Sequence, residues 1–352
     1  MGGGGAERQL SYISNEMFKS GQDVHVAYFQ DGPNIKRLNI PKENIHHLSC
    51  LNNYDPMIIY KLVKTIRKIN PHIVQTWMPQ IDILAGVASI LTRTPFILSE
   101  RSSPLAYGHG WKDRFRIIIG KKADAIIANS KEGIDYWINK INKPALKVIR
   151  NGIPFDEIYQ VPKFSLSSQQ IDESKEIILF AGRYDKPKNL YNLLTALQQV
   201  LKEREQTIVF FFGRGPQKET LINLNKKDKN SDRIKIMDYS DELWSWFKVA
   251  DVFVSISDYE GNPNTVLEAV ASKCPVVISD IPGHREFLNE ESSWLVPGFN
   301  TKAIAQGVIK ALSDPPNARC KAENAYNKVK DWSINSVVKE YISFYKLILK
   351  KR

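Results

Sequence analysis

Short apolar segments that alternate with helical segments constrain the fold of this chain more than any other feature. In the second half, apolar runs predict buried strands at 177–181, 208–212, 234–237, 252–255 and 276–279, with helices that include 189–201 and 302–312. In the first half, strands are predicted at 24–29, 45–49, 73–76, 95–99, 125–128 and 146–149, with helices that include 56–69 and 81–92. This alternation is typical of a parallel sheet with helices on both faces. We therefore predict an α/β protein built from doubly wound, Rossmann-like sheets.

The length of 352 residues makes two domains the natural expectation. The segment 164–174 is polar and aperiodic, so we predict it to be the interdomain linker, with domains at 1–160 and 161–332. The final segment, 333–352, carries apolar residues at a helical period and is predicted to be a helix.

Two carboxylates bracket a strand–turn–helix segment near the end of the second half. A buried strand at 251–257 leads into Glu260, Gly261 and Asn262, and we predict that Asn262 caps a helix whose first residue is Pro263. Glu268 then lies in the second helical turn, on the face that carries Asn264 and Thr265. In open α/β sheets, ligands bind beyond the carboxyl ends of the strands. Carboxylates that bind hydroxyls, beside a helix N-terminus that binds phosphate, indicate a nucleotide sugar as the ligand.

Two further loops follow predicted strands in the same half. The strand 176–181 continues into Gly182-Arg183 and reaches Lys188 before a helix begins, and the strand 208–212 ends in Gly213-Arg-Gly215. With these motifs in this order, the chain resembles the retaining glycosyltransferases of family 4 over nearly its whole length. That family has the GT-B fold, which consists of two Rossmann-like domains and a cleft between them. The resemblance also implies that the C-terminal helix returns to the N-terminal domain.

The resemblance assigns roles to the residues of these loops. Arg183 and Lys188 match positions that bind the donor diphosphate, and Glu260 matches the position that contacts the donor sugar and stabilises charge near its anomeric carbon. These three are the expected catalytic residues, and Glu268 is expected to bind the ribose hydroxyls. The other expected donor-binding residues are Gly261, Asn262, Asn264, Thr265, Gly213 and Gly215.

The first domain carries fewer signals. Gly3 and Gly4 lie in a segment that looks like the Gly-rich substrate-binding loop after the first strand of the family, and we expect that strand to lie upstream of Met1 as five to seven apolar residues. Where many family members have a histidine, this sequence has Ser99-Glu100-Arg101, so Glu100 or Arg101 is expected to take over its role near the sugar. The segment 75–77 is expected to line the acceptor site. His284, in the second domain, is expected to be a surface loop histidine.

Charge and cysteine content narrow the function further. Residues 1–160 hold 21 Lys and Arg against 14 Asp and Glu, and residues 161–352 hold 28 against 24, without a block of like charge. This balance, without a nucleic-acid-binding motif, favours an anionic donor and an anionic membrane surface as partners over nucleic acid. The three cysteines predict neither disulfides nor a zinc site, which favours the cytoplasm. No Asp-x-Asp pair is present, so neither a metal ion nor another cofactor is expected.

The expected activity is therefore transfer of a hexosyl or N-acetylhexosaminyl group from a nucleoside diphosphate, with UDP expected, and with retention of configuration. The acceptor is expected to be a glycan or a polyprenyl-diphosphate-linked sugar in the synthesis of cell-surface polysaccharide such as capsule or O-antigen. The basic and apolar segment 111–122 is expected to bring the protein to the inner face of the cell membrane as a peripheral protein. Two alternatives stay open: a sugar-nucleotide epimerase of the same fold, and a nucleotide-sugar-binding subunit without catalysis.

Overall fold

The computed structural model describes residues 1–50, 55, 57–108, 110–142 and 144–351. The chain forms two compact units, Met1–Gly152 with Trp332–Arg352, and Ile153–Asp331. The change of unit lies at Gly152 and not at 160, because helix α6 (Phe155–Gln160) packs on the second unit through the ring of Phe155 against Tyr326. The polar segment 164–174 also lies within the second unit and is not a linker, since Phe164 stacks on Trp246.

The second unit has one parallel sheet in the order β12-β11-β10-β7-β8-β9. Its strands are β7 (Glu176–Ala181), β8 (Thr207–Phe212), β9 (Ile234–Met237), β10 (Val252–Ser255), β11 (Val276–Ser279) and β12 (Trp294–Val296). The longest pairing runs from Glu176↔Thr207 to Ala181↔Phe212. From β7 the chain builds outward through β8 and β9, and from β10 it builds in the opposite direction through β11 and β12. The strand order therefore reverses between β7 and β10, which is the topological switch point of a doubly wound sheet.

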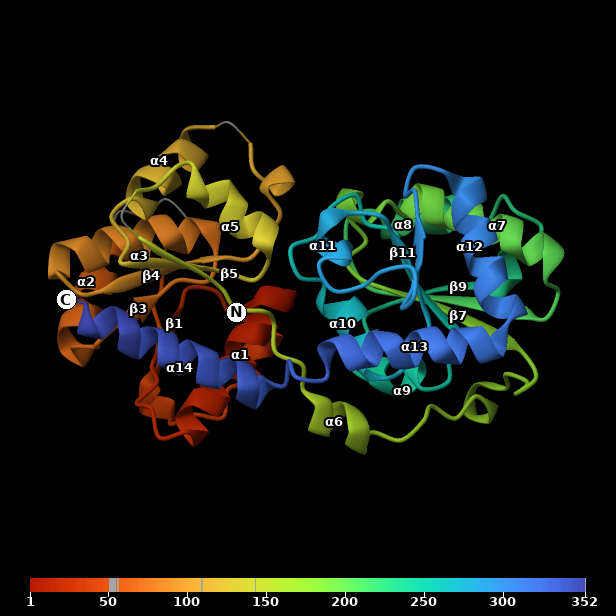
Figure 1. Ribbon diagram of the computed structural model, residues 1–352, viewed down its shortest axis with the longest axis horizontal. Coiled ribbons are helices and arrows are strands. Elements are labelled where there is room, and N and C mark those ends of the chain that lie inside the picture. The colour runs from red at the N-terminus through yellow and green to blue at the C-terminus, as the bar shows by residue number, and fades with distance from the viewer. Residues whose placement is uncertain (51–54, 56, 109, 143, 352) are drawn as a thin grey trace. The chain divides into compact units, whose positions relative to one another are not determined.

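Helices cover both faces of this sheet, as Figure 1 shows. They are α7 (Leu190–Glu203), α8 (Lys218–Asn225), α9 (Leu243–Phe247), α10 (Asn264–Ala271), α11 (Pro282–Arg285), α12 (Thr301–Ser313) and α13 (Pro315–Val329). Helices α7, α8 and α12 pack on one face and share a core with Ile178, Phe180 and Val254. Helices α9 and α10 contact the strands on the other face, and α13 packs on α10.

The first unit has two separate parallel sheets, a pair β1-β2 and a sheet in the order β3-β4-β5-β6. The strands are β1 (Val26–Tyr28), β2 (Ile45–His47), β3 (Val74–Gln75), β4 (Phe96–Glu100), β5 (Ala125–Ala128) and β6 (Ala145–Val148). Among the strands of the described part of this unit, none pairs with the second edge of β1 or of β3. The described strands of the first unit therefore form two separate sheets and not one continuous sheet.

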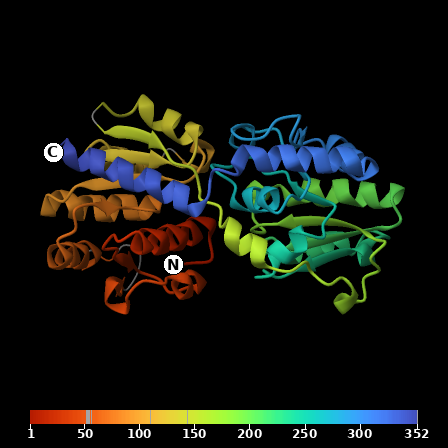
Figure 2. The same ribbon diagram turned by 60° about the horizontal axis from the view of Figure 1, so that its bottom comes forward.

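Successive side chains of β4 and β5 face opposite sides of the sheet, and a separate layer of helices covers each side. Its helices are α1 (Gly5–Lys19), α2 (Met57–Ile69), α3 (Pro79–Thr92), α4 (Trp111–Gly120), α5 (Lys131–Ile138) and α14 (Ile334–Lys350). Ile97 and Ile127 face a layer of α1 and α14, whereas Leu98 and Ile126 face Trp137 of α5 on the other side. The helix α14 thus belongs to the first unit although it follows the second in sequence, and Figures 1 and 2 both show it beside α1. None of the helices in the described residues is long and apolar enough to cross a membrane.

Candidate functional site

Lys188 and Glu260 meet at the switch point of the second unit. Lys188 ends a 3₁₀ turn (Lys186–Lys188) that follows β7, and Glu260 lies in the loop that follows β10. Because β7 and β10 are neighbours, their carboxyl ends bring the two side chains together, and Lys188 Nζ forms an ion pair with Glu260 Oε1. Ser257 Oγ donates a second hydrogen bond to the same carboxylate oxygen at 2.7 Å. The side chains retain 20% and 15% exposure, so a ligand can reach both.

The electrostatic environment keeps Glu260 ionised. Burial acts to raise the pKa of its carboxyl, but the ammonium of Lys188 and the hydrogen bonds from Lys188 and Ser257 outweigh burial, so the pKa lies below its usual value. Glu260 therefore presents a carboxylate beside Lys188, with which it forms an ion pair. The pair can bind hydroxyls through the first group and phosphate oxygens through the second.

Glu268 is almost completely buried in α10, where Trp244 Nε1 of α9 donates a hydrogen bond of 3.0 Å to Oε2. The helix begins at Asn264, with Pro263 as its N-cap, and not at Pro263 with Asn262 as the cap. The reason is local, because Pro263 has an extended ψ of 102° and cannot be the first helical residue in that conformation. The shift leaves Gly261 and Asn262 in the loop before the helix N-terminus, with Asn264 and Thr265 in its first turn.

Arg183 lies two residues beyond β7 and is less constrained than Lys188. Its side chain is 70% exposed, and its guanidinium is held by Asp185 at 2.6 Å. The structure therefore places Arg183 at the same end of the sheet as Lys188 and Glu260, but it does not bond it to either of them.

Two glycines allow close backbone contacts at this edge of the sheet. A Cβ atom on Gly213 would lie 1.9 Å from the carbonyl oxygen of Gly182, so the loops after β7 and β8 can approach only because no side chain is present. A Cβ atom on Gly283 would lie 2.3 Å from the carbonyl oxygen of Glu260. Sequence reasoning missed Gly283, because a single Pro-Gly dipeptide carries no signal for the loop that it contacts.

His284 is buried, which corrects the expectation of a surface histidine. Its Nδ1 donates to the carbonyl oxygen of Ser279 at 2.8 Å, and within the described residues its Nε2 has no hydrogen-bond partner. Burial lowers the pKa of the imidazole, so the ring is neutral at pH 7. The turn of α11 places this ring behind the Glu260 loop, which Gly283 contacts.

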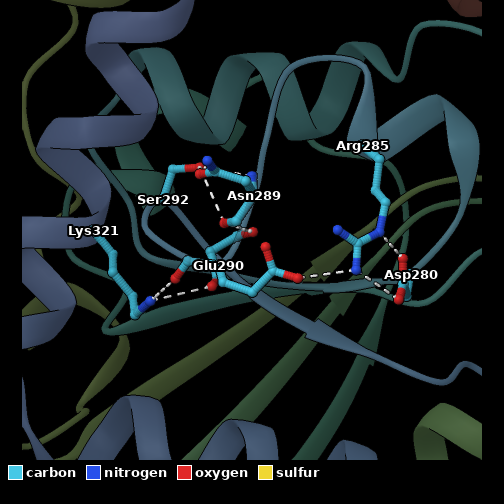
Figure 3. Close-up of polar contacts among 7 residues, drawn as sticks. Asp280, Arg285, Asn289, Glu290, Ser292 and Lys321 are labelled. Carbon is cyan, nitrogen blue, oxygen red and sulfur yellow. Dashed lines mark hydrogen bonds and ion pairs between the residues drawn. The ribbon is translucent and has the colours of Figure 1, made fainter.

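A surface network holds the segment that carries Gly283 and His284 (Figure 3). Arg285 donates to Asp280 at 2.9 Å and to Glu290 at 3.0 Å, and Lys321 Nζ donates to the carbonyl oxygen of Glu290. A few residues on, Ser292 Oγ and Asn289 close a turn with a bond of 2.9 Å. These exposed ion pairs contribute little stability. They do tie α11 to the sheet edge and to α13.

In the first unit, Glu100 is not available to a ligand, which corrects the prediction that it contacts substrate. It is fully buried at the end of β4, where Arg116 donates at 2.9 Å and Trp137 Nε1 at 3.0 Å to Oε2. Arg116 also donates at 2.7 Å to Asp82, a second buried carboxylate. The three charged groups form a closed interior network, so Glu100 serves to hold α3 and α4 against β4.

Arg101 is half-buried and joins α14 to the sheet. Its guanidinium carbon lies 3.9 Å from the centre of the Trp77 ring, and it donates hydrogen bonds to Asn151 and to the hydroxyl of Tyr341. Trp77 is itself buried in the core beside Tyr341. Gln75 donates at 2.8 Å to Ser99. Gln75 is half-buried and Trp77 is buried, and both line a cavity of the first unit. The place of segment 75–77 in an acceptor site stays a prediction.

Gly3 and Gly4 precede α1, with Gly4 as the N-cap of that helix. Their position at a helix N-terminus is the one predicted for a Gly-rich loop, and no side chain caps the helix. In the described parts of the chain, no group of three or more His, Cys, Asp or Glu residues is arranged to hold a metal ion.

The chain is similar to known proteins over nearly its whole length. Residues 3–157 match the family model for Glycosyltransferase Family 4, and residues 163–328 match the model for Glycosyl transferases group 1. The chain is 22% identical to an N-acetylgalactosamine-N,N'-diacetylbacillosaminyl-diphospho-undecaprenol 4-alpha-N-acetylgalactosaminyltransferase of Campylobacter jejuni, over 98% of the chain and 96% of the relative. It is 24% identical to the capsular polysaccharide biosynthesis glycosyltransferase CapM of Staphylococcus aureus, over 95% and 92%.

A solved structure shows the same fold. The crystal structure of HepE from Anabaena in complex with UDP-glucose superposes with a TM-score of 0.83 at 20% identity, covering 97% of this chain and 96% of that one.

Proposed function

Since this chain belongs to glycosyltransferase family 4 and has the GT-B fold, we propose that it transfers a hexosyl or N-acetylhexosaminyl group from a UDP-sugar with retention of anomeric configuration. The observation that carries the proposal is the Lys188–Glu260 pair at the switch point, with Glu268 buried in the adjoining helix. Glycosyl transfer itself follows from the family. The donor nucleotide, the sugar and the stereochemistry are proposed.

Each charged group has a place in the proposed donor site. Lys188 and the exposed Arg183 neutralise the diphosphate, whose negative charge grows as the glycosidic bond breaks. The N-terminus of α10, with Asn264 and Thr265 in its first turn, adds backbone N–H groups for the same anion. Glu268 accepts hydrogen bonds from the ribose hydroxyls, and Glu260 accepts them from the sugar.

The proposed chemistry needs no base from the protein. The acceptor oxygen forms a bond to the anomeric carbon on the side from which the diphosphate departs, the bond from that carbon to the phosphate oxygen breaks, and the acceptor proton passes to the leaving phosphate. Glu260 stays ionised beside the developing positive charge at the anomeric carbon. We propose that the reaction is independent of metal ions, with Lys188 and Arg183 stabilising the leaving group.

A panel of UDP-, GDP- and ADP-sugars tests the donor, first by the shift in melting temperature and then by transfer to a lipid-linked acceptor. A UDP-sugar that shifts the melting temperature, and whose sugar appears in an alpha-linked product, supports the proposal. Release of an epimerised sugar nucleotide without acceptor would identify an epimerase. Binding without turnover of any donor would identify a binding subunit.

We propose a polyprenyl-diphosphate-linked glycan as the acceptor, since the Campylobacter relative is named for one and the Staphylococcus relative for capsular polysaccharide synthesis. A lipid-linked acceptor requires the enzyme at a membrane surface. Helix α4 offers such a face, because Trp111 (68% exposed), Phe115 and Ile118 (53% exposed) recur at a helical spacing on its outer side. Exposed cations flank this stripe at Lys112, Arg114, Lys121 and Lys122.

The structure corrects one detail of the membrane prediction. Arg116 is buried between two carboxylates and is not part of the cationic face. We propose that the remaining four cations and the apolar stripe bind anionic lipid, each cation contributing about 1 kcal/mol. Binding to anionic but not neutral vesicles, which is lost when the four cations become Gln, supports this. Binding that ignores lipid charge, or that an equal number of Gln substitutions on the second unit removes equally, contradicts it.

A further inference from the structure

His284 is a buried polar residue that the proposed reaction does not use. It belongs to α11, and the residue before it, Gly283, packs directly on the carbonyl of Glu260. Burial is the main cause that lowers the pKa of the imidazole. The charge of Glu260 acts to raise this pKa and that of Lys188 acts to lower it. The ring therefore lies within electrostatic reach of the Lys188–Glu260 pair.

Three hydrogen bonds in series connect this ring to the carboxylate of Glu260. His284 Nδ1 lies 3.3 Å from Oγ of Ser279 and 2.8 Å from the carbonyl oxygen of the same residue. Ser279 Oγ donates at 2.6 Å to the carbonyl oxygen of Ser257, in the loop that follows β10. Ser257 Oγ donates in turn at 2.7 Å to Glu260 Oε1. Both serines are 1% exposed, so these bonds are shielded from water.

The acceptors in this series determine where its protons lie. The carbonyl of Ser257 can only accept, so it takes the single hydroxyl proton of Ser279. Both oxygens of Ser279 that face the ring are then acceptors, and Nδ1 of the neutral imidazole must carry the ring proton. This N–H fixes the hydroxyl of Ser279 in the orientation that donates to Ser257. Because the ring is neutral, it does so without adding a positive charge beside Glu260.

Stability alone does not account for a histidine at this position. Within the described residues Nε2 has no hydrogen-bond partner, and an unpaired buried acceptor lowers the free energy of unfolding. The carbonyl of Ser279 also accepts from the N–H of Ile281 at 3.0 Å, so it keeps a partner when the ring is absent. An apolar side chain of similar size would therefore fold at least as well as histidine.

We propose that His284 is a positioning residue for glycosyl transfer, which orients the hydroxyl of Ser279 and, through Ser257, holds the carboxylate of Glu260 in place. The inference rests on the proposed role of Glu260 beside the anomeric carbon. Since that role is expected mainly in the transition state, a misplaced carboxylate lowers kcat and leaves KM for the donor nearly unchanged.

Two variants of His284 separate positioning from packing, with kcat and KM measured on the UDP-sugar that gives transfer in the donor panel. His284→Leu should lower kcat about five-fold or more, with the melting temperature unchanged or higher. In His284→Asn, the side-chain N–H replaces that of Nδ1, so kcat should stay within about two-fold of the wild type. The control is Ser292→Ala, which removes another buried hydroxyl of the second unit, one that bonds to Asn289, and should leave kcat unchanged.

Double variants test the series itself. Ser279→Ala should lower kcat as His284→Leu does, and the two together should lower it no further, because both break the same series. In a Glu260→Gln background, His284→Leu should change kcat less than about two-fold.

The possible failures are distinguishable. If no UDP-sugar is transferred, or if Glu260→Gln keeps the wild-type kcat, the proposed role of Glu260 is wrong and this inference falls with it. If Glu260→Gln lowers kcat but His284→Leu does not, only the positioning role is wrong. Equal losses in His284→Leu and His284→Asn, a fall in melting temperature that accompanies the loss, or a full effect in the Glu260→Gln background would also overturn it.

Discussion

Replacing Glu260 by Gln tests whether Glu260 acts mainly in the transition state, while Glu268 acts mainly in binding the donor. Gln keeps the size of the side chain and can still accept hydrogen bonds from Lys188 and Ser257, but it removes the negative charge. A hydrogen bond to a charged group contributes about 1.5–3 kcal/mol. If that contribution is made mainly in the transition state, kcat falls about 10–150-fold. The KM for the donor stays the same or falls, because Lys188 no longer faces a negative charge that competes with the diphosphate.

Glu268→Gln provides the contrast. Its carboxylate is buried and accepts a hydrogen bond from Trp244. We expect its contact with the ribose in the ground and transition states alike, because the ribose takes no part in the bond changes. Loss of such a contact raises KM and leaves kcat nearly unchanged. Initial rates over a range of donor concentrations, at saturating acceptor, give both constants. Glu290→Gln, which removes an exposed carboxylate of the same unit, is the control. The reasoning fails if Glu260→Gln raises KM with kcat intact, or if both variants change the two constants equally.

Three further results are expected. Arg183→Ala or Lys188→Ala should each lower transfer about 10–150-fold without a change in the melting temperature of more than a few degrees, and wild-type rates in either variant would remove that residue from the site. Arg116→Met should lower the free energy of unfolding by about 3–5 kcal/mol, because Asp82 and Glu100 are left as buried charges. Urea denaturation measures this free energy. A loss below about 1 kcal/mol would mean that water or neutralisation of the two carboxylates compensates for the lost guanidinium. Transfer should survive EDTA, and a complete loss that magnesium or manganese restores would show that a metal ion takes part.

The place of Lys188 and Glu260 at one edge of the sheet could be predicted from the sequence, because both follow predicted strands and the carboxyl ends of parallel strands share one edge. Their ion pair was not predicted. The short β12 was missed, because three residues are too few to show a period. The burial of Glu100 could not be predicted either, since it depends on Arg116 and Asp82, which belong to separate helices.

His284 shows the same limit in the second unit. A histidine between a glycine and an arginine in a predicted loop carries no sign of burial, and only the packing of α11 against the sheet removes it from water. Strand alternation thus predicts which loops gather at the edge of a sheet, but not which polar side chains in them are enclosed by helices from elsewhere in the chain.

The helix α14 imposes an order on biosynthesis. The ribosome must add the roughly 180 residues between Gly152 and Trp332 before it reaches this helix, which takes about 10–40 s. Until then Val338 and Tyr341 cannot pack on the strands β4 and β5. The apolar face of these strands is therefore exposed and can bind chaperones or other nascent chains. The second unit, being continuous in sequence, can fold during that interval. Completion of the first unit should therefore follow synthesis of α14, and changes to this helix should affect the first unit more than the second.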